Sequence, residues 1–191
     1  MQNRTLLYIL IAFVAIFLIF DVFTLFTKKP KFEITFYQTK VEIDYSENST
    51  ITTLAVLSFN KQQDMFNYME SYNNAASSTF IDYFKKISDE IGKQLVVVNY
   101  NNKATERAGV LEIEEQAVIK NLVTKKDKYY ELSMGKLPIN SNNDSEFIIY
   151  LPQNTKVISI DPTPTTISNN TLKWNGGALE YFPTVIYTKS F

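Results

Sequence analysis

Residues 50–69, TITTLAVLSFNKQQDMFNYM, contain the change of pattern that decides the fold class. Residues 50–59 are rich in β-branched side chains, and the odd-numbered residues from Ile51 to Phe59 form one largely apolar face, as in a strand. From Asn60 onward the apolar residues recur at every third or fourth position, as on one face of a helix. A strand that runs directly into an amphipathic helix predicts a fold that mixes both elements.

The stretch before residue 50 predicts the partner strand. Residues 32–45, FEITFYQTKVEIDY, alternate with a period of two, but the apolar positions are even-numbered up to Phe36 and odd-numbered from Val41. Because a slip of one residue would turn the apolar face outward, we expect a bulge or kink near Gln38. Residues 46–49, SENS, are typical of a turn, so the two strands are predicted to form a β-hairpin.

The helical stretch runs from Asn60 to Gly92. Asn60 fits an N-cap, with Gln63 three residues on, and Gly92 fits a C-terminal stop. The residues NNAASS at 73–78 interrupt the pattern, so we expect two helices. One continuous helix is the alternative; it would be roughly 48 Å long, against a diameter of about 40 Å for a compact domain of this size. The apolar stripes, which we expect to belong mainly to the core, are Met65, Phe66, Tyr68, Met69 and Tyr72, then Phe80, Tyr83, Phe84, Ile87 and Ile91.

The second half of the chain predicts further strands. Residues 95–100, LVVVNY, form a short apolar run without strict alternation, which favours a central strand, and the polar residues 101–108 indicate a loop. Residues 161–170, DPTPTTISNN, indicate an extended loop. The other strands are predicted at residues 110–123, 128–134, 146–151 and 156–160, with the first two paired across a turn at 124–127.

The C-terminal residues predict a last hairpin. Asn175-Gly176 suits a type I′ turn, which would join residues 171–174, with Trp174 at least partly shielded, to residues 178–182. Pro183 lacks the N–H that a central strand needs, so residues 184–187 are expected at a sheet edge. Together the patterns predict a single α+β domain over residues 32–191, with a mainly antiparallel sheet and an inserted pair of amphipathic helices packed on it.

Residues 6–26, LLYILIAFVAIFLIFDVFTLF, predict a transmembrane helix. At about 1.5 Å per residue, a stretch of this length spans the hydrocarbon core of roughly 30 Å. Insertion scales give roughly −4 to −7 kcal/mol for the Leu, Ile, Val and Phe side chains of residues 6–20, against at most about 3.5 kcal/mol for Asp21. We expect Asp21 near the membrane interface; a polar contact to another membrane helix is the alternative.

The residues that follow this stretch favour an uncleaved anchor. A cleaved signal peptide would end in small residues, which the sequence DVFTLFTKKPK at 21–31 lacks. Residues 1–31 are therefore predicted as a membrane anchor with a basic juxtamembrane stretch. The count of positive charges favours a cytoplasmic domain by one charge, but long domains translocate largely regardless of charge. Because a composition rich in Asn, Ser, Thr and Tyr suits an external domain, we expect residues 32–191 outside the cytoplasm.

Composition excludes several classes of function. Residues 32–191 hold 15 basic and 19 acidic residues, a net charge of −4, so the basic footprint of a nucleic-acid-binding protein is missing. The sequence has no Cys and no His. It therefore has no thiol nucleophile and no zinc–thiolate site, and carboxylates, Lys, Tyr or hydroxyls would have to carry any chemistry. We expect no catalytic residue, no cofactor and no metal.

Residues 140–146, NSNNDSE, resemble the start of a calcium-binding loop. Its oxygen-bearing side chains belong to Asn140, Asn142, Asp144 and Glu146. The EF-hand pattern fails, because Ser145 stands where Gly is needed and Leu151 where Glu is needed. We expect a solvated loop rather than a cation site.

Three neighbouring glutamates, Glu112, Glu114 and Glu115, are a second candidate site, because paired carboxylates can act as acid and base. Glu112 and Glu114 fall on the polar face of an alternating strand, so we expect a solvated strand face instead. Five glycines leave little room for a phosphate-binding loop or a nucleophile elbow.

Four C-terminal segments follow a pattern found elsewhere: residues 151–152 (LP), 157–164 (VISIDPTP), 170–174 (NTLKW) and 183–187 (PTVIY). With the predicted anchor and the β-rich remainder, they resemble a group of archaeal membrane-anchored proteins of unknown function. The likeness covers about a third of the chain. It implies an envelope location, and it carries over no catalytic residue.

The favoured function is a membrane-anchored, non-catalytic envelope domain that acts in protein interaction or as an accessory subunit of a surface assembly. Its expected partners are membrane lipid and either a second protein or a second copy of the chain. Aromatic residues left exposed would form the contact surface; the candidates are Phe66, Tyr68, Tyr72, Tyr129 and Tyr130. The alternative is an extracytoplasmic hydrolase of glycan or peptide that uses carboxylates or a Ser-Lys pair.

Overall fold

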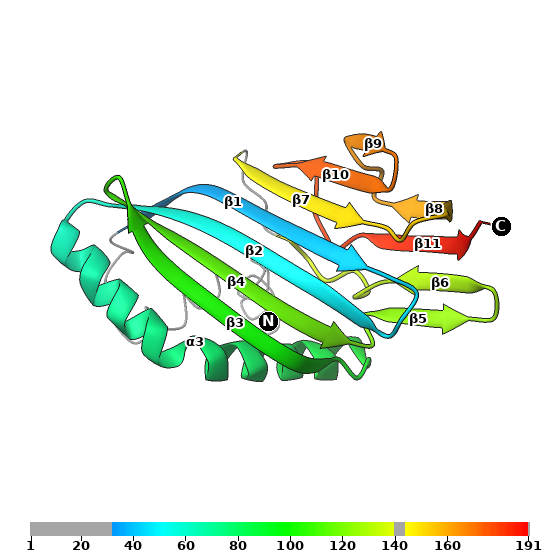
Figure 1. The fold of residues 1–191 in the computed structure, drawn as a ribbon, viewed down its shortest axis with the longest axis horizontal. Helices are drawn as coiled ribbons and strands as arrows, with labels where there is room; N and C mark the ends of the chain where they lie inside the picture. The colour runs from blue at the N-terminus through cyan, green and yellow to red at the C-terminus, as the bar shows by residue number, and fades with distance from the viewer. Residues whose placement is uncertain (1–31, 140–143, 191) are drawn as a thin grey trace, which may run out of the picture.

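The structure, a computed structural model, describes residues 32–139 and 144–190. This part of the chain forms a long helix, α3 (Gln62–Ile91), and eleven strands in two sheets (Figure 1). The predicted anchor, residues 6–26, lies outside the described residues. Within them, no helix combines the length and apolar character that a membrane crossing needs.

The larger sheet has seven strands in the order β3-β4-β2-β1-β7-β10-β9. All its neighbouring strands are antiparallel except β1 and β7, which are parallel. With one helix against mainly antiparallel strands, the predicted α+β class is confirmed. The strands are β1 (Phe32–Ile43), β2 (Asn48–Phe59), β3 (Val96–Arg107), β4 (Val110–Lys120), β7 (Ser145–Tyr150), β9 (Thr166–Ser168) and β10 (Thr171–Asn175).

The smaller sheet has four antiparallel strands in the order β5-β6-β11-β8. Its strands β8 and β11 lie near β7 and β10, whereas β5 and β6 lie beyond the ends of β1, β2 and β4 (Figure 1). Consecutive strands of the described residues change sheet five times, from β4 to β5, from β6 to β7, from β7 to β8, from β8 to β9 and from β10 to β11. The strands are β5 (Val123–Lys126), β6 (Tyr129–Leu132), β8 (Thr155–Asp161) and β11 (Thr184–Lys189).

The first hairpin, β1 with β2, has the predicted partners and inward face, but its irregularity lies between Ile34 and Phe36, not near Gln38. After this bulge, the odd-numbered residues of β1 face inward, beginning with Tyr37 and Thr39, which are buried. The sequence pattern placed the slip too late because Tyr and Thr were not counted as core residues.

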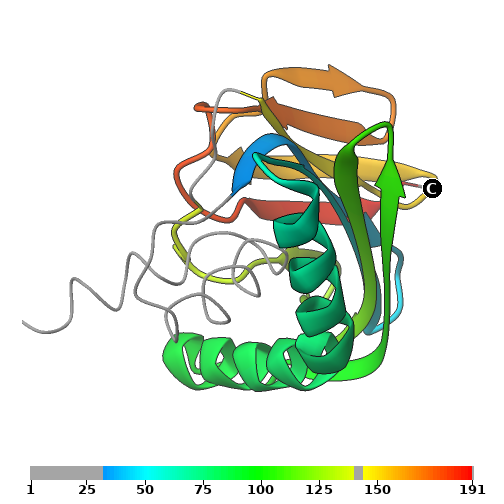
Figure 2. The ribbon, with the colours of Figure 1, turned by 90° about the vertical axis from the view of Figure 1, so that its left-hand side faces the viewer.

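Helix α3 begins at Gln62, and its N-cap is Lys61, which makes no side-chain capping bond. The prediction of Asn60 as the N-cap is therefore wrong. Gly92 ends the helix as predicted: its φ of 63° is left-handed, and its N–H donates to the Ser88 carbonyl. Residues 62–91 are hydrogen-bonded as one helix, but that helix is bent into two limbs that cover one face of the larger sheet (Figures 1 and 2). The bend lets both predicted apolar stripes reach the sheet.

Strand β3 differs from its prediction in length and in place. It continues through the polar residues 101–107, which the pattern assigned to a loop, and it forms an edge of the sheet rather than its centre. An edge strand has one partner and faces water along most of its length, so it tolerates polar side chains. Its ladder to β4 supplies the backbone hydrogen bonds, across a tight turn in which Ala108 and Gly109 have positive φ.

Two predicted pairings are wrong. Residues 128–134 were expected to pair with residues 110–123, but Asn121, in a left-handed conformation, ends that strand, and β6 pairs with β5. The last hairpin was expected across Asn175-Gly176, but β10 pairs with β9 and β7, and residues 178–182 contribute only an isolated bridge from Tyr181.

The C-terminal strand β11 was expected at an edge, but it lies between β6 and β8. Pro183 precedes the first residue of the strand, so its missing N–H is not needed in the ladder. The prediction for Trp174 is confirmed, because its side chain is fully buried. Its ring packs edge-on against Phe147, with ring centroids 6.0 Å apart. Its Nε1 donates to the Pro162 carbonyl at 3.2 Å.

Candidate functional site

A buried carboxylate lies between helix α3 and the larger sheet. Glu115 of β4 is 2% exposed, and both of its carboxylate oxygens accept hydrogen bonds. Tyr72 of α3 and Tyr100 of β3 donate to Oε1 at 2.8 and 2.7 Å, and Thr53 of β2 donates to Oε2 at 3.3 Å. We call these four residues the Glu115 centre. Their hydroxyl groups satisfy a group that would otherwise be costly to bury.

The electrostatics of the Glu115 centre favour a protonated carboxyl. Burial raises the pKa of Glu115 to about 7, although the bonds from Tyr100, Tyr72 and Thr53 act in the opposite direction. Burial also raises the pKa of Tyr72 and of Tyr100, and the nearby Glu115 raises both further. The centre can therefore hold or release one proton near neutral pH, but it is closed to solvent.

The three candidate glutamates do not converge. Glu114 is exposed and Glu112 pairs with Arg107 at 3.5 Å, as expected of a solvated strand face. For Glu115 that expectation is wrong. It has the same parity as Leu111, Ile113 and Ala117, so its side chain points toward the core. The sequence alone could therefore have placed Glu115 on the inward face. We overlooked this because Glu115 directly follows two glutamates of the outward face.

The loop that resembles the start of a calcium-binding loop, and that we expect to be solvated, is only partly described. Asn140 and Asn142 lie outside the described residues. Glu146, in β7, accepts from Gln38 Nε2 at 2.8 Å and from Lys173 Nζ at 2.7 Å. The bond from Lys173 is the main reason why the pKa of Glu146 lies below its ordinary value. Among residues 32–139 and 144–190, no group of three or more acidic side chains is arranged to hold a metal ion.

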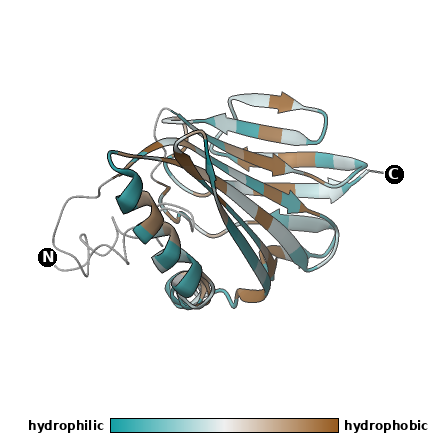
Figure 3. Ribbon diagram, turned by 60° about the vertical axis from the view of Figure 1, so that its left-hand side comes forward, coloured by the Kyte–Doolittle hydropathy of each residue, from teal (hydrophilic) through white to brown (hydrophobic). Residues whose placement is uncertain are grey.

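A partly apolar groove lies where the second limb of α3 meets the start of β3. It encloses about 360 Å³. Figure 3 shows a hydrophobic stretch where the chain leaves α3 and enters β3. Ile81 and Val96 in the groove and Val98 just beyond it are 48, 41 and 57% exposed. We call it the edge groove; its lining residues are Ile81, Phe84, Lys85, Ser88, Asp89, Gln94, Leu95, Val96 and Val97.

The aromatic residues expected at a contact surface divide between core and surface. Tyr68 and Tyr72 are buried, whereas Phe66 and Tyr129 are 40 and 38% exposed. Tyr130 is half-buried, and its ring stacks on that of Tyr187 with the ring centroids 5.4 Å apart. The exposed residues of the edge groove are aliphatic, so a search restricted to aromatic residues missed it. The signal available in the sequence was the run Val96–Val98, which was assigned to a central strand.

Comparison with known families identifies the chain. The model of a domain of unknown function, DUF4897, matches residues 32–188. The chain belongs to this family. Membership of DUF4897 confirms the coarser part of the resemblance, an uncharacterised domain family, while the archaeal and membrane-anchored parts stay predictions.

Other comparisons add little to the DUF4897 assignment. No curated protein matches the chain. Among solved structures, the NMR structure of the folded domain of the LppM protein of Mycobacterium tuberculosis is similar, with a TM-score of 0.47 and 9% sequence identity. The match covers 86% of this chain and 95% of the LppM domain. We carry no function over from a likeness this distant.

Proposed function

We propose that this protein is a membrane-anchored envelope domain that acts by binding a second protein at the edge groove. The anchor is the apolar stretch 6–26, and the domain lies outside the cytoplasm. The resemblance to archaeal membrane-anchored proteins supports the same location. The net charge of −4 over residues 32–191 makes nucleic acid and anionic lipid poor partners for the domain.

The observation that carries the proposal is the exposed apolar surface beside an edge strand. On the side away from β4, β3 has no partner strand within the described residues. An unpaired edge can accept a strand from another protein through its backbone groups, while neighbouring pockets take that protein's side chains. Ile81, Val96 and Val98 supply such apolar contacts at one end of β3.

The partner is a short extended apolar segment of a different protein rather than a second copy. If two copies paired antiparallel along the whole of β3, Val96 would lie opposite Arg107 and Val97 opposite Glu106 of the other copy. Burying a charge against an apolar side chain is unfavourable. A foreign apolar strand avoids this mismatch.

The alternative function, an extracytoplasmic hydrolase, is not supported by its first candidate group, the three neighbouring glutamates. Glu115 is enclosed by Tyr72, Tyr100 and Thr53, so a substrate cannot reach it without opening the core. Glu112 and Glu114 point to the opposite face of β4. No observation in the described residues favours hydrolysis over binding.

Orientation is tested by adding protease to intact cells that carry a C-terminally tagged chain. We expect digestion of the tag and of the domain. Protection in intact cells, with digestion only after lysis, would place the domain in the cytoplasm and contradict the proposed location.

Binding is tested with a photo-crosslinking amino acid placed at position 81 or 98 in native membranes. Ile158 and Ile167 are matched controls, because they are 48 and 60% exposed but lie on β8 and β9. We expect one discrete heteromeric product from positions 81 and 98. The product from position 81 should be lost in a Val98→Lys chain that retains an unchanged melting curve. Equal labelling at all four positions, or a product with twice the mass of the chain, would contradict the proposal.

A further inference from the structure

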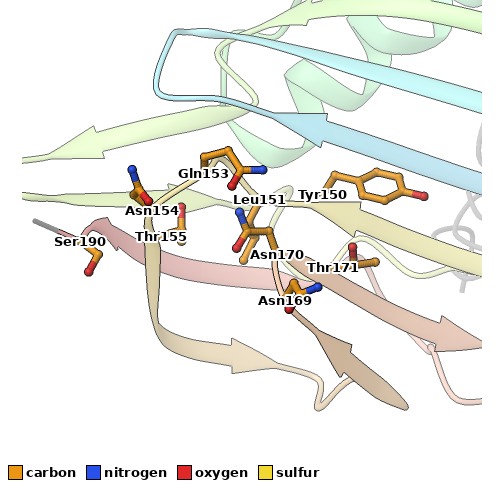
Figure 4. Close-up of a pocket in the computed structure, with 9 residues that line it drawn as sticks. All are labelled: Tyr150, Leu151, Gln153, Asn154, Thr155, Asn169, Asn170, Thr171 and Ser190. Atoms are coloured by element: carbon orange, nitrogen blue, oxygen red, sulfur yellow. The ribbon is translucent and has the colours of Figure 1, made fainter.

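A second, chemically different hollow lies beside β7, β8 and β10, which are separated from β3 in the strand order. It encloses about 820 Å³, within the range of roughly 300–1,000 Å³ typical of small-ligand sites. Figure 4 shows side chains from the β7–β8 connection, from the β9–β10 turn and from the C-terminus around it. We call it the amide hollow; its lining residues are Tyr150, Leu151, Gln153, Asn154, Thr155, Asn169, Asn170, Thr171 and Ser190.

Hydrogen bonds to backbone carbonyls fix the walls of the amide hollow. Leu151 N–H donates to the Asn170 carbonyl at 2.8 Å, and the Asn170 side chain donates back to the Pro152 carbonyl at 2.8 Å. The Tyr45 hydroxyl lies 3.1 and 3.0 Å from the carbonyls of Gln153 and Asn154. The two loops are therefore tied to each other and to the end of the first hairpin, so a ligand would meet a largely preformed surface.

The lining has an unusual chemistry because none of its nine residues is charged, and seven carry an amide or a non-aromatic hydroxyl. Gln153, Asn154 and Asn169 are exposed, and their side chains make no hydrogen bond to any other residue of the described ranges. Each amide offers two donors and one acceptor oxygen. A charged ligand would find no counter-charge there, and an apolar ligand would leave these groups without partners.

A neutral ligand with many hydroxyl groups matches this lining, because each hydroxyl both donates and accepts. Tyr150, which is half-buried, also lines the hollow, and its ring extends away from Gln153 and Asn154 (Figure 4). We propose that the amide hollow binds a neutral saccharide. This site is independent of the edge groove, since β3 and β9 form opposite edges of the larger sheet.

Turn formation explains part of the sequence but not the whole site. Asn154 and Asn169 have φ values of 55° and 50°, a conformation in which Asn is favoured for backbone reasons alone. Backbone preference does not require Gln153 beside them, nor their convergence on one hollow. It does supply a clean variant, because Asn→Gly keeps the left-handed turn and removes only the amide.

The test uses the full chain in a detergent without a sugar headgroup and an array of immobilised oligosaccharides. The array carries neutral hexose and N-acetylhexosamine chains beside sialylated and sulfated ones. We expect binding to a subset of the neutral chains, weakened at least tenfold by Gln153→Ala combined with Asn169→Gly. Asn121→Gly is the matched control: Asn121 also has a positive φ, but it lies outside the hollow, and this change should leave binding unchanged.

A second arm separates the two sources of such a ligand. Phosphatidylcholine vesicles with and without a neutral glycolipid are compared with soluble oligosaccharides. Binding to either form, sensitive to the double variant, supports the proposal and shows whether the saccharide is free or lipid-borne. Binding only to charged glycans, equal binding by the double variant, or no binding in either arm would overturn it.

Discussion

The Glu115 centre and the amide hollow treat polar groups in opposite ways. In the Glu115 centre, each carboxylate oxygen has a hydroxyl donor, and the group is sealed between helix and sheet. In the amide hollow, the amides of Gln153, Asn154 and Asn169 stand at the surface without a partner among the described residues. Buried polar groups whose hydrogen bonds are satisfied can stabilise a fold or switch its state. Polar groups without a partner on a preformed surface are available to a ligand.

The largest effect is expected from an unpaired charge placed inside the Glu115 centre. We expect Glu115→Lys to lower the free energy of unfolding by about 3–5 kcal/mol, because the ammonium group would meet hydroxyls but no counter-charge. Gln116→Lys is the control, since residue 116 is exposed and faces Thr52 and Asn101; it should change stability by about 0.5 kcal/mol or less. Urea unfolding followed by the fluorescence of the single Trp, Trp174, measures both. Equal effects would contradict the buried site.

A slightly smaller effect is expected from pH. The pKa of Glu115 is raised from 4.5 to about 7, so the folded state holds its proton more tightly than the unfolded chain. This stabilising contribution is fully present below pH 4.5 and is lost as the pH rises to 7, a change of about 3 kcal/mol. The tyrosines that face the carboxyl, Tyr37, Tyr68, Tyr72 and Tyr100, have raised pKa values and stay neutral in this window.

Glu115→Gln isolates this contribution, because other carboxylates titrate over the same range. The difference between the two stability curves should fall across pH 4.5–7 and be flat elsewhere. A constant difference over the whole range would show that Glu115 keeps an ordinary pKa.

The hydroxyl donors allow a finer test. We expect Tyr72→Phe and Tyr100→Phe each to cost about 1–3 kcal/mol, since each leaves Glu115 with one donor fewer. Because these bonds lower the pKa of Glu115, each variant should also move the pH midpoint upward. Tyr129→Phe, at an exposed ring, is the control. An unchanged midpoint in both variants would mean that the two bonds do not form.

The smallest effect is expected at a surface ion pair. Lys173 Nζ lies 2.7 Å from Glu146 Oε1, and the two side chains are 34 and 28% exposed. We expect Lys173→Met to cost less than about 1 kcal/mol, because solvent screens such pairs. The lowered pKa of Glu146 contributes stability above its unfolded pKa, and this contribution disappears in acid. If the same urea unfolding showed a loss of stability comparable with that of Glu115→Lys, the exposure of an ion pair would be a poor guide to its contribution to stability.

The sequence predicted the elements better than their pairing. Period-two alternation located β1, β2 and β4, and Gly92 marked the helix end, since these signals are local. Pairing depends on residues far apart in the chain, and no local pattern specifies that β7 lies beside β1. The polar half of β3 was missed because an edge strand does not need an apolar face.

The candidate sites were predicted less well, for two physical reasons. The Glu115 centre needs donors from β2, β3 and α3, so its closure follows from tertiary packing, although parity alone placed Glu115 on the inward face. The amide hollow joins residues 150–155 to residues 169–171 and Ser190, which converge only after both sheets form. Asn and Gln in these segments indicated only loops.

The parallel pairing of β1 with β7 also delays the completion of the larger sheet during translation. About 100 residues separate the end of β1 from the start of β7, so β1 leaves the ribosome long before its second neighbour exists. At roughly 5–20 residues per second, the nascent chain carries an open strand edge on β1 for about 5–20 s. Until translation reaches β7, that edge is a template for mispairing between nascent chains, and a chaperone or the translocation machinery would have to shield it.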